Sequence, residues 1–341
     1  MGADSEVTAM IRRDRSGKCL SVVAPAYNEA AVLDLFFEQL EPVLDACVTT
    51  YEIICINDGS RDATLPILLA RRRRNPRIKI IDFTRNFGKE VALTAGLDAA
   101  EGDMIVPMDV DLQDPPGVIA EFVDRWEEGY DVVYGLRADR SRDSLLKRWT
   151  SRAFYSLFNT LSTVEMPSDA GDFRLMDREV VQALRRLPER SRFMKGLFAW
   201  VGFRQVGVSY ARPERVAGKT TWRYWKLWNF ALDGVTAFSG LPIRVWSYIG
   251  GVAAAAAFLW ALVIVFRTLM FGRDQAGYPS LAVFILGGFG LQMLAIGTLG
   301  EYVSRIYQEV KQRPLYLVRS RFGWDQDADV GRNYSIVSKA S

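Results

Sequence analysis

The sequence predicts an α/β protein with a mostly parallel, Rossmann-like sheet, followed by amphipathic helices and a two-helix transmembrane hairpin. Short apolar runs alternate with segments of helical length, which is the pattern of a doubly wound sheet. Unusual polar residues follow these runs, and two long segments near the C-terminus have no charged residue. We therefore divide the chain into a mobile tail, a sheet domain, interface helices, a hairpin and a second tail. Their bounds are 1–18, 19–221, 222–244, 245–303 and 304–341.

The expected strands of the sheet are apolar runs of four to six residues. They lie at 19–24, 51–56, 77–82, 104–108 and 131–134, with a later strand at 203–210. Helices are expected at 30–46, 89–100 and 115–128. Right-handed crossovers bring the carboxyl ends of parallel strands to one edge of the sheet, where ligands of such sheets bind.

Polar residues that follow the strands should therefore form a single site at that edge. These residues are Asn28, Glu29, Asp58, Arg85, Lys89, Asp109, Asp111 and Arg137. The carboxylate of Asp58 could bind a ribose or a base, although Asp58-Gly59-Ser60 is also compatible with a plain turn.

Two carboxylates follow the run at 104–108. Asp109 and Asp111 can both direct oxygens at a hard divalent cation, and Gln113 adds another oxygen. Phosphates of a ligand can supply the remaining bonds. The alternative is that these acids only cap the next helix, a role that fits Asp114. We favour the metal–diphosphate site and assign the cap to Asp114.

Composition excludes several other kinds of site. The chain has no histidine, so a His-based triad or a His-rich metal site is excluded. Lys+Arg 43 and Asp+Glu 40 nearly balance, and the net charge of +3 does not indicate nucleic-acid binding. The three cysteines lack Cys-x-x-Cys spacing, so we expect reduced core residues. A cationic loop at 212–219 fits a phosphate ligand and an exposed linker equally well.

The end of the chain has the composition of a membrane segment. A Trp-rich amphipathic stretch at 222–244 is typical of a membrane interface. Residues 245–266 and 278–300 lack charge, and each segment exceeds the ~20 residues that cross a bilayer. Basic residues flank the outer ends of the hairpin, which predicts that the sheet domain and both termini are cytoplasmic. The predicted location is therefore the cytoplasmic membrane, with a multi-pass topology.

Five motifs, in order, together resemble those of family 2 glycosyltransferases of the GT-A fold. They are Ala24-Pro25-Ala26-Tyr27-Asn28-Glu29, Asn57-Asp58-Gly59-Ser60-Arg61-Asp62, Arg85-Asn86-Phe87-Gly88-Lys89, Asp109-Val110-Asp111-Leu112-Gln113-Asp114 and Gly171-Asp172-Phe173-Arg174-Leu175. More narrowly, the chain is similar to the polyisoprenyl-phosphate glycosyltransferases, such as bacterial bactoprenol glucosyltransferases and dolichol-phosphate mannose synthase.

The resemblance implies a role for each matched residue. The nucleoside would be held by Pro25, Tyr27, Glu29 and Asp58, with Lys89 near the diphosphate. Mg²⁺ or Mn²⁺ would be bound by Asp109, Asp111 and Gln113. Catalysis would involve Asp172, with Asp111 and Arg215. The acceptor phosphate would meet Arg137, Arg215 and Lys219.

Two positions depart from the family pattern. Asn57 stands where the family usually has the first acid of Asp-Asp-Gly-Ser. Thr221 stands where a loop lysine is usual, with Lys219 and Arg223 nearby.

The implied function is transfer of a hexose, with inversion, from a nucleotide-sugar to undecaprenyl phosphate, for modification of cell-envelope glycans. We favour UDP-glucose as donor and expect contact with membrane lipid and a homo-oligomer, a tetramer by resemblance. Two alternatives are a GDP-mannose-dependent mannose synthase and a non-catalytic membrane protein that binds nucleotide or lipid carrier.

Overall fold

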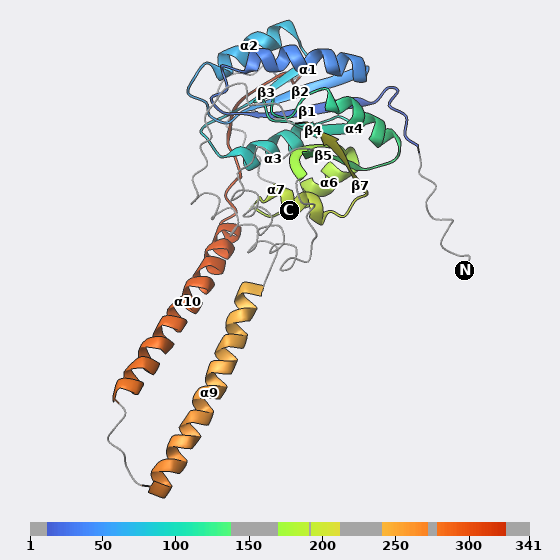
Figure 1. The fold of residues 1–341 in the computed structure, drawn as a ribbon. Coiled ribbons are helices and arrows are strands. Elements are labelled where there is room, and N and C mark those ends of the chain that lie inside the picture. The colour runs from blue at the N-terminus through green and yellow to red at the C-terminus, as the bar shows by residue number, and fades with distance from the viewer. Residues whose placement is uncertain (1–11, 138–169, 191, 212–240, 272–277, 325–341) are drawn as a thin grey trace, which may run out of the picture.

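The computed structural model of the chain describes residues 12–137, 170–190, 192–211, 241–271 and 278–324 (Figure 1). Within these residues, eight strands form one sheet in the order β7-β5-β6-β4-β1-β2-β3-β8. The strands are β1 (Cys19–Ala26), β2 (Thr50–Asn57), β3 (Ile78–Phe83), β4 (Met104–Pro107), β5 (Val132–Arg137), β6 (Ala170–Asp177), β7 (Gln205–Tyr210) and β8 (Val318–Phe322). The helices are α1 (Leu33–Cys47), α2 (Thr64–Arg74), α3 (Lys89–Ala99), α4 (Val118–Glu127), α6 (Arg178–Arg186), α7 (Met194–Trp200), α9 (Leu241–Phe271) and α10 (Tyr278–Val310).

The central strands of the sheet are parallel. Strand β1 pairs in parallel with β2 and β4, β2 with β3, and β5 with β7. Strand β6 lies between β4 and β5 and is antiparallel to both, and β8 is antiparallel to β3. Most residues of β1 and β2 are buried, as expected for parallel strands that helices cover on both faces. The predicted α/β fold with a mostly parallel sheet is therefore confirmed.

Helices cover the two faces of the sheet and create two hydrophobic cores. On one face, α1 and α4 contribute large buried side chains such as Phe36, Phe37 and Phe122. On the other face, α3, α6 and α7 pack through residues such as Leu93 and Phe198. The sheet is thus held rigidly from both sides, so the loops at its carboxyl edge start from fixed positions.

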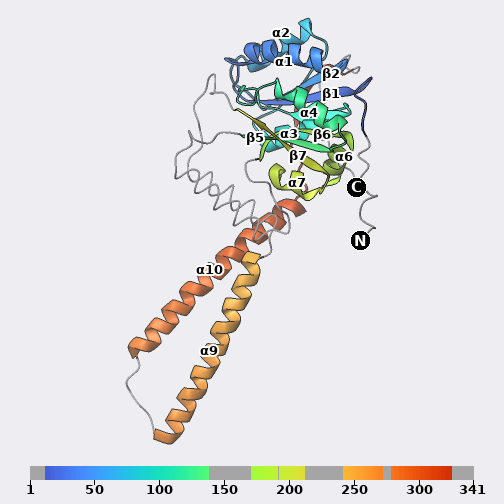
Figure 2. The same ribbon diagram turned by 45° about the vertical axis from the view of Figure 1, so that its right-hand side comes forward.

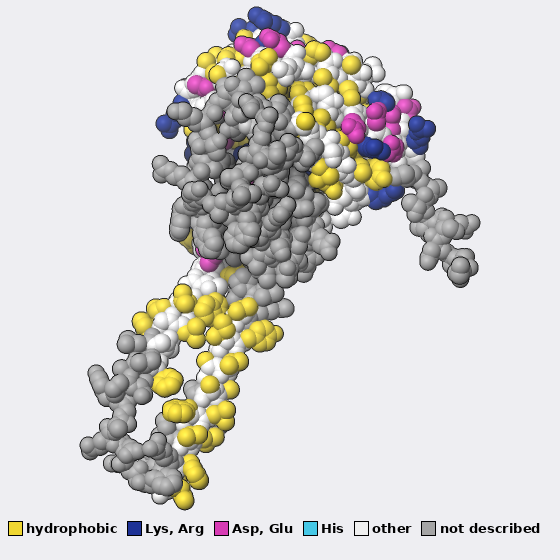
Figure 3. Space-filling model, in the orientation of Figure 1, with side chains coloured by type: hydrophobic (Ala, Val, Ile, Leu, Met, Phe, Trp, Pro, Cys, Tyr) yellow, Lys and Arg dark blue, Asp and Glu magenta, His cyan; other side chains and the backbone are white. Residues whose placement is uncertain are grey.

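Helices α9 and α10 form an antiparallel pair that projects from the sheet domain (Figures 1 and 2). The indole nitrogen Nε1 of Trp246 donates a hydrogen bond to Oγ1 of Thr298 at 2.8 Å and joins the two helices. Large apolar side chains are exposed along both helices (Figure 3). Examples are Leu269 of α9 and Leu294 of α10. These side chains do not contribute to the core of the sheet domain.

The predicted transmembrane hairpin is not confirmed. A helix needs about 20 consecutive, mainly apolar residues to cross a bilayer. Among the residues that the structure describes, no helix is long and apolar enough for such a crossing. The prediction that the chain is a multi-pass protein of the cytoplasmic membrane is contradicted by this finding.

Several predictions fall wholly or partly outside the described residues. They concern the interface helices over most of 222–244, the loop that contains Arg215, Lys219 and Thr221, and most of the tail at 1–18. The other predicted tail, 304–341, contains the end of α10 and strand β8.

The close packing of α3 on the sheet gives a test of the fold. A Cβ atom on Gly96 would lie 2.2 Å from Cγ1 of Val23 and 2.7 Å from Cδ1 of Ile56. Gly96→Ala should therefore lower the free energy of unfolding by about 1–3 kcal/mol, the usual cost of overpacking. Denaturant unfolding measures this change. Gly117→Ala is the matched control, because a Cβ there has no described atom within 4 Å. Equal stability of the two variants would contradict the packing of α3.

Candidate active site

Three elements bring charged side chains together at the carboxyl edge of the sheet. Asp109 lies two residues after β4, and Lys89 is the first residue of α3. Strand β6 runs antiparallel to β4, with Asp177 opposite Met104, so β6 begins beyond the carboxyl end of β4. Asp172, near the start of β6, therefore reaches the same edge as Asp109.

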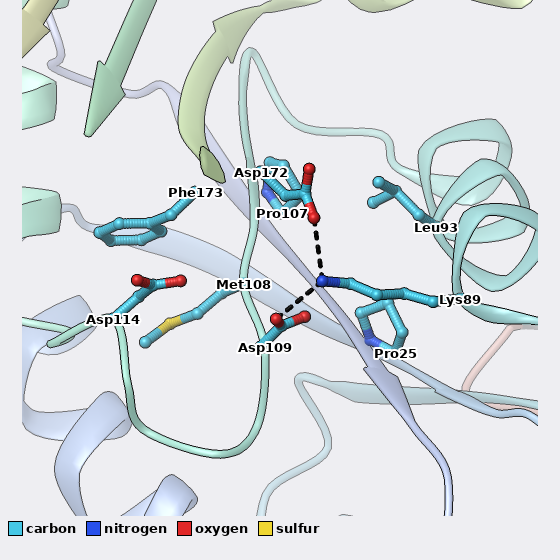
Figure 4. Close-up of a pocket in the computed structure, with 9 residues that line it drawn as sticks. All are labelled: Pro25, Lys89, Leu93, Pro107, Met108, Asp109, Asp114, Asp172 and Phe173. Atoms are coloured by element: carbon cyan, nitrogen blue, oxygen red, sulfur yellow. Dashed lines mark hydrogen bonds and ion pairs between the residues drawn. The ribbon is translucent and has the colours of Figure 1, made fainter. Parts of the chain in front are cut away.

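The ammonium group of Lys89 bridges the two carboxylates. Its Nζ atom lies 2.8 Å from Oδ2 of Asp109 and 2.9 Å from Oδ2 of Asp172 (Figure 4). The side chain of Asp172 is 22% exposed and that of Lys89 is 44% exposed, so a ligand can reach the bridge from solvent. One cation thus joins an acid in the loop after β4 to an acid in β6.

The position of Lys89 depends on Asp58. The two carboxylate oxygens of Asp58 accept hydrogen bonds from the backbone N–H groups of Phe87 (2.7 Å) and Gly88 (3.0 Å). Gly59 has φ +65°, and a Cβ there would lie 2.4 Å from the carbonyl carbon of Arg85, so this turn requires glycine. Asp58 therefore fixes the turn that leads into α3, a contact that is separate from its predicted role toward the nucleoside.

The charges of the bridge are stabilised by one another. Burial alone would raise the pKa of Asp172, but the ammonium groups of Lys89 and Lys195 outweigh burial and hold this pKa well below its usual value. Burial would lower the pKa of Lys89, but Asp172 and Asp109 raise it above its usual value. Burial raises the pKa of Asp109, although Lys89 opposes this shift. Asp172 and Lys89 are therefore both charged near neutral pH.

The bridge lies in a pocket whose walls are partly apolar. The pocket is lined by Pro25, Lys89, Leu93, Pro107, Met108, Asp109, Asp114, Asp172 and Phe173 (Figure 4). Four of the residues predicted for the site are among them: Pro25, Lys89, Asp109 and Asp172. The structure thus brings together residues from the first, third, fourth and fifth of the five motifs.

The prediction for Asp114 is wrong. Helix α4 has Gly117 at its N-cap, with no side-chain cap. Asp114 instead is buried and accepts a hydrogen bond from the hydroxyl of Tyr210. Because these residues lie 96 positions apart in the chain, no local sequence pattern indicates the contact.

Other predicted residues lie near the pocket or beyond its lining. Asp111 is buried, and its Oδ1 atom accepts the backbone N–H of Gln113 at 3.2 Å. Tyr27 is 43% exposed in the loop after β1, followed by the partly buried Glu29. Arg137 ends β5, opposite Tyr210 of β7.

The acids that could bind a metal ion do not supply a complete coordination shell. Among the described residues, no three acidic or cysteine side chains group closely enough to hold an ion by themselves. Proteins usually bind Mg²⁺ with one or two carboxylates, and water and substrate phosphates complete the shell. The donor set of Asp109 and Asp111, with the amide oxygen of Gln113, fits that kind of site.

Glu90 is an acidic neighbour of the bridge that the sequence did not indicate as a site residue. Its Oε2 atom is buried and has no hydrogen-bond partner among the described residues. Burial and the negative charge of Asp172 raise its pKa to about 7, and Lys89 and Lys195 oppose the shift. In the sequence, Glu90 only looks like an acid in the first turn of a helix, where acids are common.

This pKa predicts how stability depends on pH. Between the ordinary Glu pKa of 4.5 and the raised value of about 7, the folded protein binds a proton that the unfolded chain has lost. Stability should therefore fall as pH rises through this window. Glu90→Gln should remove that loss and raise the free energy of unfolding at pH 8 by on the order of 1–3 kcal/mol.

Denaturant unfolding at pH 5 and pH 8 tests this expectation. The control is Glu121→Gln, which changes an exposed acid in the first turn of α4. An increase in the free energy of unfolding that is the same for both variants, or that is no larger at pH 8 than at pH 5, would contradict the environment assigned to Glu90.

The chain is similar to known glycosyltransferases over most of its length. It is 50% identical over 304 residues to an uncharacterized glycosyltransferase of Synechocystis, covering 89% of this chain and 96% of that protein. It is 48% identical over 300 residues to the SfII prophage-derived bactoprenol glucosyl transferase of Shigella flexneri, covering 88% and 97%. A prophage bactoprenol glucosyl transferase homolog of Escherichia coli is 47% identical over 300 residues, with coverage of 88% and 98%.

A family model described as glycosyl transferase family 2 matches residues 21–185. This segment contains most of β1, all of β2 to β6 and all three members of the charged bridge. The family match and the relatives that align with 88–89% of the chain both show that the chain belongs to glycosyl transferase family 2.

Proposed function

We propose that this chain transfers a hexose, with glucose from UDP-glucose favoured, to a polyprenyl phosphate with inversion at the anomeric carbon. The lipid acceptor is supported by the 48% identity to a relative named bactoprenol glucosyl transferase. The chemistry is supported by one observation in the site, the ammonium of Lys89 between the carboxylates of Asp109 and Asp172.

Lys89 is suited to the leaving group of this reaction. A donor whose diphosphate enters the pocket beside Asp109 meets a cation that is already in place. Negative charge grows on the diphosphate as its bond to the sugar breaks, and a preorganised cation stabilises that charge. The turn held by Asp58 fixes the start of α3, so little reorganisation of the backbone is needed when the donor binds.

Asp172 is suited to orient the reacting groups and is a poor proton acceptor. Its pKa is held below the usual range, so it is a weak base near neutral pH. The acceptor needs no strong base, because a phosphate monoester has a second pKa of about 6 and is already a dianion. We assign to Asp172 the stabilisation of positive charge on the anomeric carbon and the orientation of the acceptor.

The reaction then balances in a single displacement. An oxygen of the acceptor phosphate forms a bond to the anomeric carbon from one side. The bond from this carbon to the diphosphate breaks on the other side, and its electron pair leaves with the nucleoside diphosphate. An α-linked donor would give a β-linked lipid phosphate sugar.

A divalent cation fits the same site. Asp109, Asp111 and Gln113 would hold Mg²⁺ or Mn²⁺ together with the donor diphosphate. The bound ion would supply Lewis-acid stabilisation of the leaving diphosphate. Asp109, whose Oδ2 atom accepts a hydrogen bond from Lys89 at 2.8 Å, belongs both to the bridge and to the set of residues that would hold the ion.

A transfer assay tests the proposed function. Purified protein in detergent is incubated with undecaprenyl phosphate, Mn²⁺ and a panel of radiolabelled UDP- and GDP-sugars. We expect label from UDP-glucose to move into the organic phase, as a β-linked product, and to stay in water after EDTA is added. Asp172→Asn should lower kcat by about 10²–10³-fold, the usual range for a group that stabilises transition-state charge.

Asp103→Asn is the matched control for that variant. Asp103 also pairs with a lysine, Lys18, at 3.3 Å, and its exposure of 26% is similar to that of Asp172. This pair lies at the opposite edge of the sheet, before β1 and β4.

Transfer only from GDP-mannose would favour the mannose synthase, whereas nucleotide binding without any transfer would favour a binding protein. An α-linked product would contradict the single displacement.

A further inference from the structure

The C-terminal part of the described chain returns to the sheet beside the donor side of the site. After α10, strand β8 adds to the outer edge of β3 (Figure 1). The register shifts between Asp82 and Phe83, which lie opposite Ser320 and Val318. Arg319 is therefore the extra residue of a bulge, a feature that redirects a side chain. This strand lies far outside the segment 21–185 that matches the family model.

The side chain of Arg319 reaches the carboxyl end of β3. One guanidinium nitrogen, Nη1, lies 3.4 Å from Oδ2 of Asp82, and the other, Nη2, donates to the carbonyl oxygen of Thr84 at 2.9 Å. Asp82 is only 2% exposed, so its charge needs partners within the protein. Its other oxygen, Oδ1, accepts a hydrogen bond from the amide of Asn57 at 2.7 Å.

Asn57 connects Asp82 to the loops after β1 and β2 through further hydrogen bonds. Its Oδ1 atom accepts the backbone N–H of Ser60 at 3.2 Å. The hydroxyl of Ser60 accepts the backbone N–H of Asn28 at 3.0 Å, and Oδ1 of Asn28 accepts the N–H of Arg61 at 2.8 Å. A continuous set of hydrogen bonds thus runs from β8 to the residue after Tyr27.

The same C-terminal segment supports the turn that leads to Lys89. The backbone N–H of Thr84 donates to the carbonyl of Leu317 at 3.1 Å. The ring of Tyr316 stacks on Phe83, with centroids 5.1 Å apart, and Phe83 contacts the edge of Phe87. Phe87 is one of the two residues whose N–H groups bind Asp58.

We propose that Arg319 is a positioning residue of the donor site, acting through Asp82 and Asn57 on the loops that hold the nucleoside. The nucleoside contacts of these loops rest on the proposed function. The chain of contacts also explains why Asn57 replaces the usual acid. Its amide donates to a buried carboxylate, whereas an aspartate there would place two carboxylates 2.7 Å apart. The guanidinium of Arg319 and the amide of Asn57 both pair with the carboxylate of Asp82, so no second negative charge is left beside it.

The first test measures binding of UDP in the presence of Mn²⁺ by titration calorimetry. Arg319→Gln should weaken UDP binding about 3–10-fold and raise KM for the donor, with kcat and KM for the acceptor nearly unchanged. Arg321→Gln is the matched control, because Arg321 lies in the same strand but has its guanidinium near the ring of Trp324. A merely structural role would lower the melting temperature without this split between donor and acceptor.

A charge swap gives a second, independent test. Asn57→Asp alone should weaken UDP binding, because it faces Asp82 with a second carboxylate. Adding Asp82→Asn should restore most of the binding, since an amide at 82 can donate to residue 57 and accept from Arg319.

The outcomes separate the two proposals. If the wild-type protein bound UDP but Arg319→Gln bound it equally well, or if the swap restored nothing, the role of Arg319 would be wrong and the proposed function would stand. If the wild-type protein bound no nucleotide, both would be overturned.

Discussion

The site depends on one cation shared between two acids. Lys89 lies within 2.9 Å of carboxylate oxygens from the loop after β4 and from β6, two strands that run in opposite directions. The remaining features of this edge serve to place that ammonium group. Gly96 allows α3 to lie directly on β1 and β2, and Asp58 holds the turn before α3. Because β6 is antiparallel to β4, its first residues, including Asp172, lie at the carboxyl edge of the parallel strands. In a parallel strand, the first residues would lie at the opposite edge.

The charge balance around Lys89 explains the chemistry that we assign to the site. Two cations, Lys89 and Lys195, keep Asp172 ionised, whereas Glu90 beside them has a pKa raised to about 7 by burial and by Asp172. Carboxylates in one site are thus separated into a charged one and one that titrates near neutral pH. A charged Asp172 suits a reaction whose nucleophile is already an anion. Lys89 is then available for the charge that develops on a leaving diphosphate.

The sequence was sufficient for the parts of the structure that depend on local patterns. Alternating apolar runs and helices predicted the parallel strands, and the polar residues after those strands predicted that Lys89 and Asp109 would lie at one edge, whereas Pro25 was expected there only from the family resemblance. Contacts between distant segments carry no such signal. Tyr210 and Asp114 are 96 positions apart, and Arg319 and Asp82 are 237 apart. Hydropathy alone also led to a hairpin across a membrane, whereas among the described residues no helix meets the requirement for a crossing.

The shared cation is tested most directly by a double-mutant cycle between Lys89 and Asp172. The variants Lys89→Met, Asp172→Asn and their combination would be compared by kcat/KM, with Lys18→Met and Asp103→Asn as a control cycle. If the two residues act as a unit, the double variant should be little worse than either single one, with a coupling of at least about tenfold, or ~1.4 kcal/mol. The control cycle should leave the rate unchanged. Additive losses at Lys89 and Asp172 would contradict the account, because each residue would then act without the other.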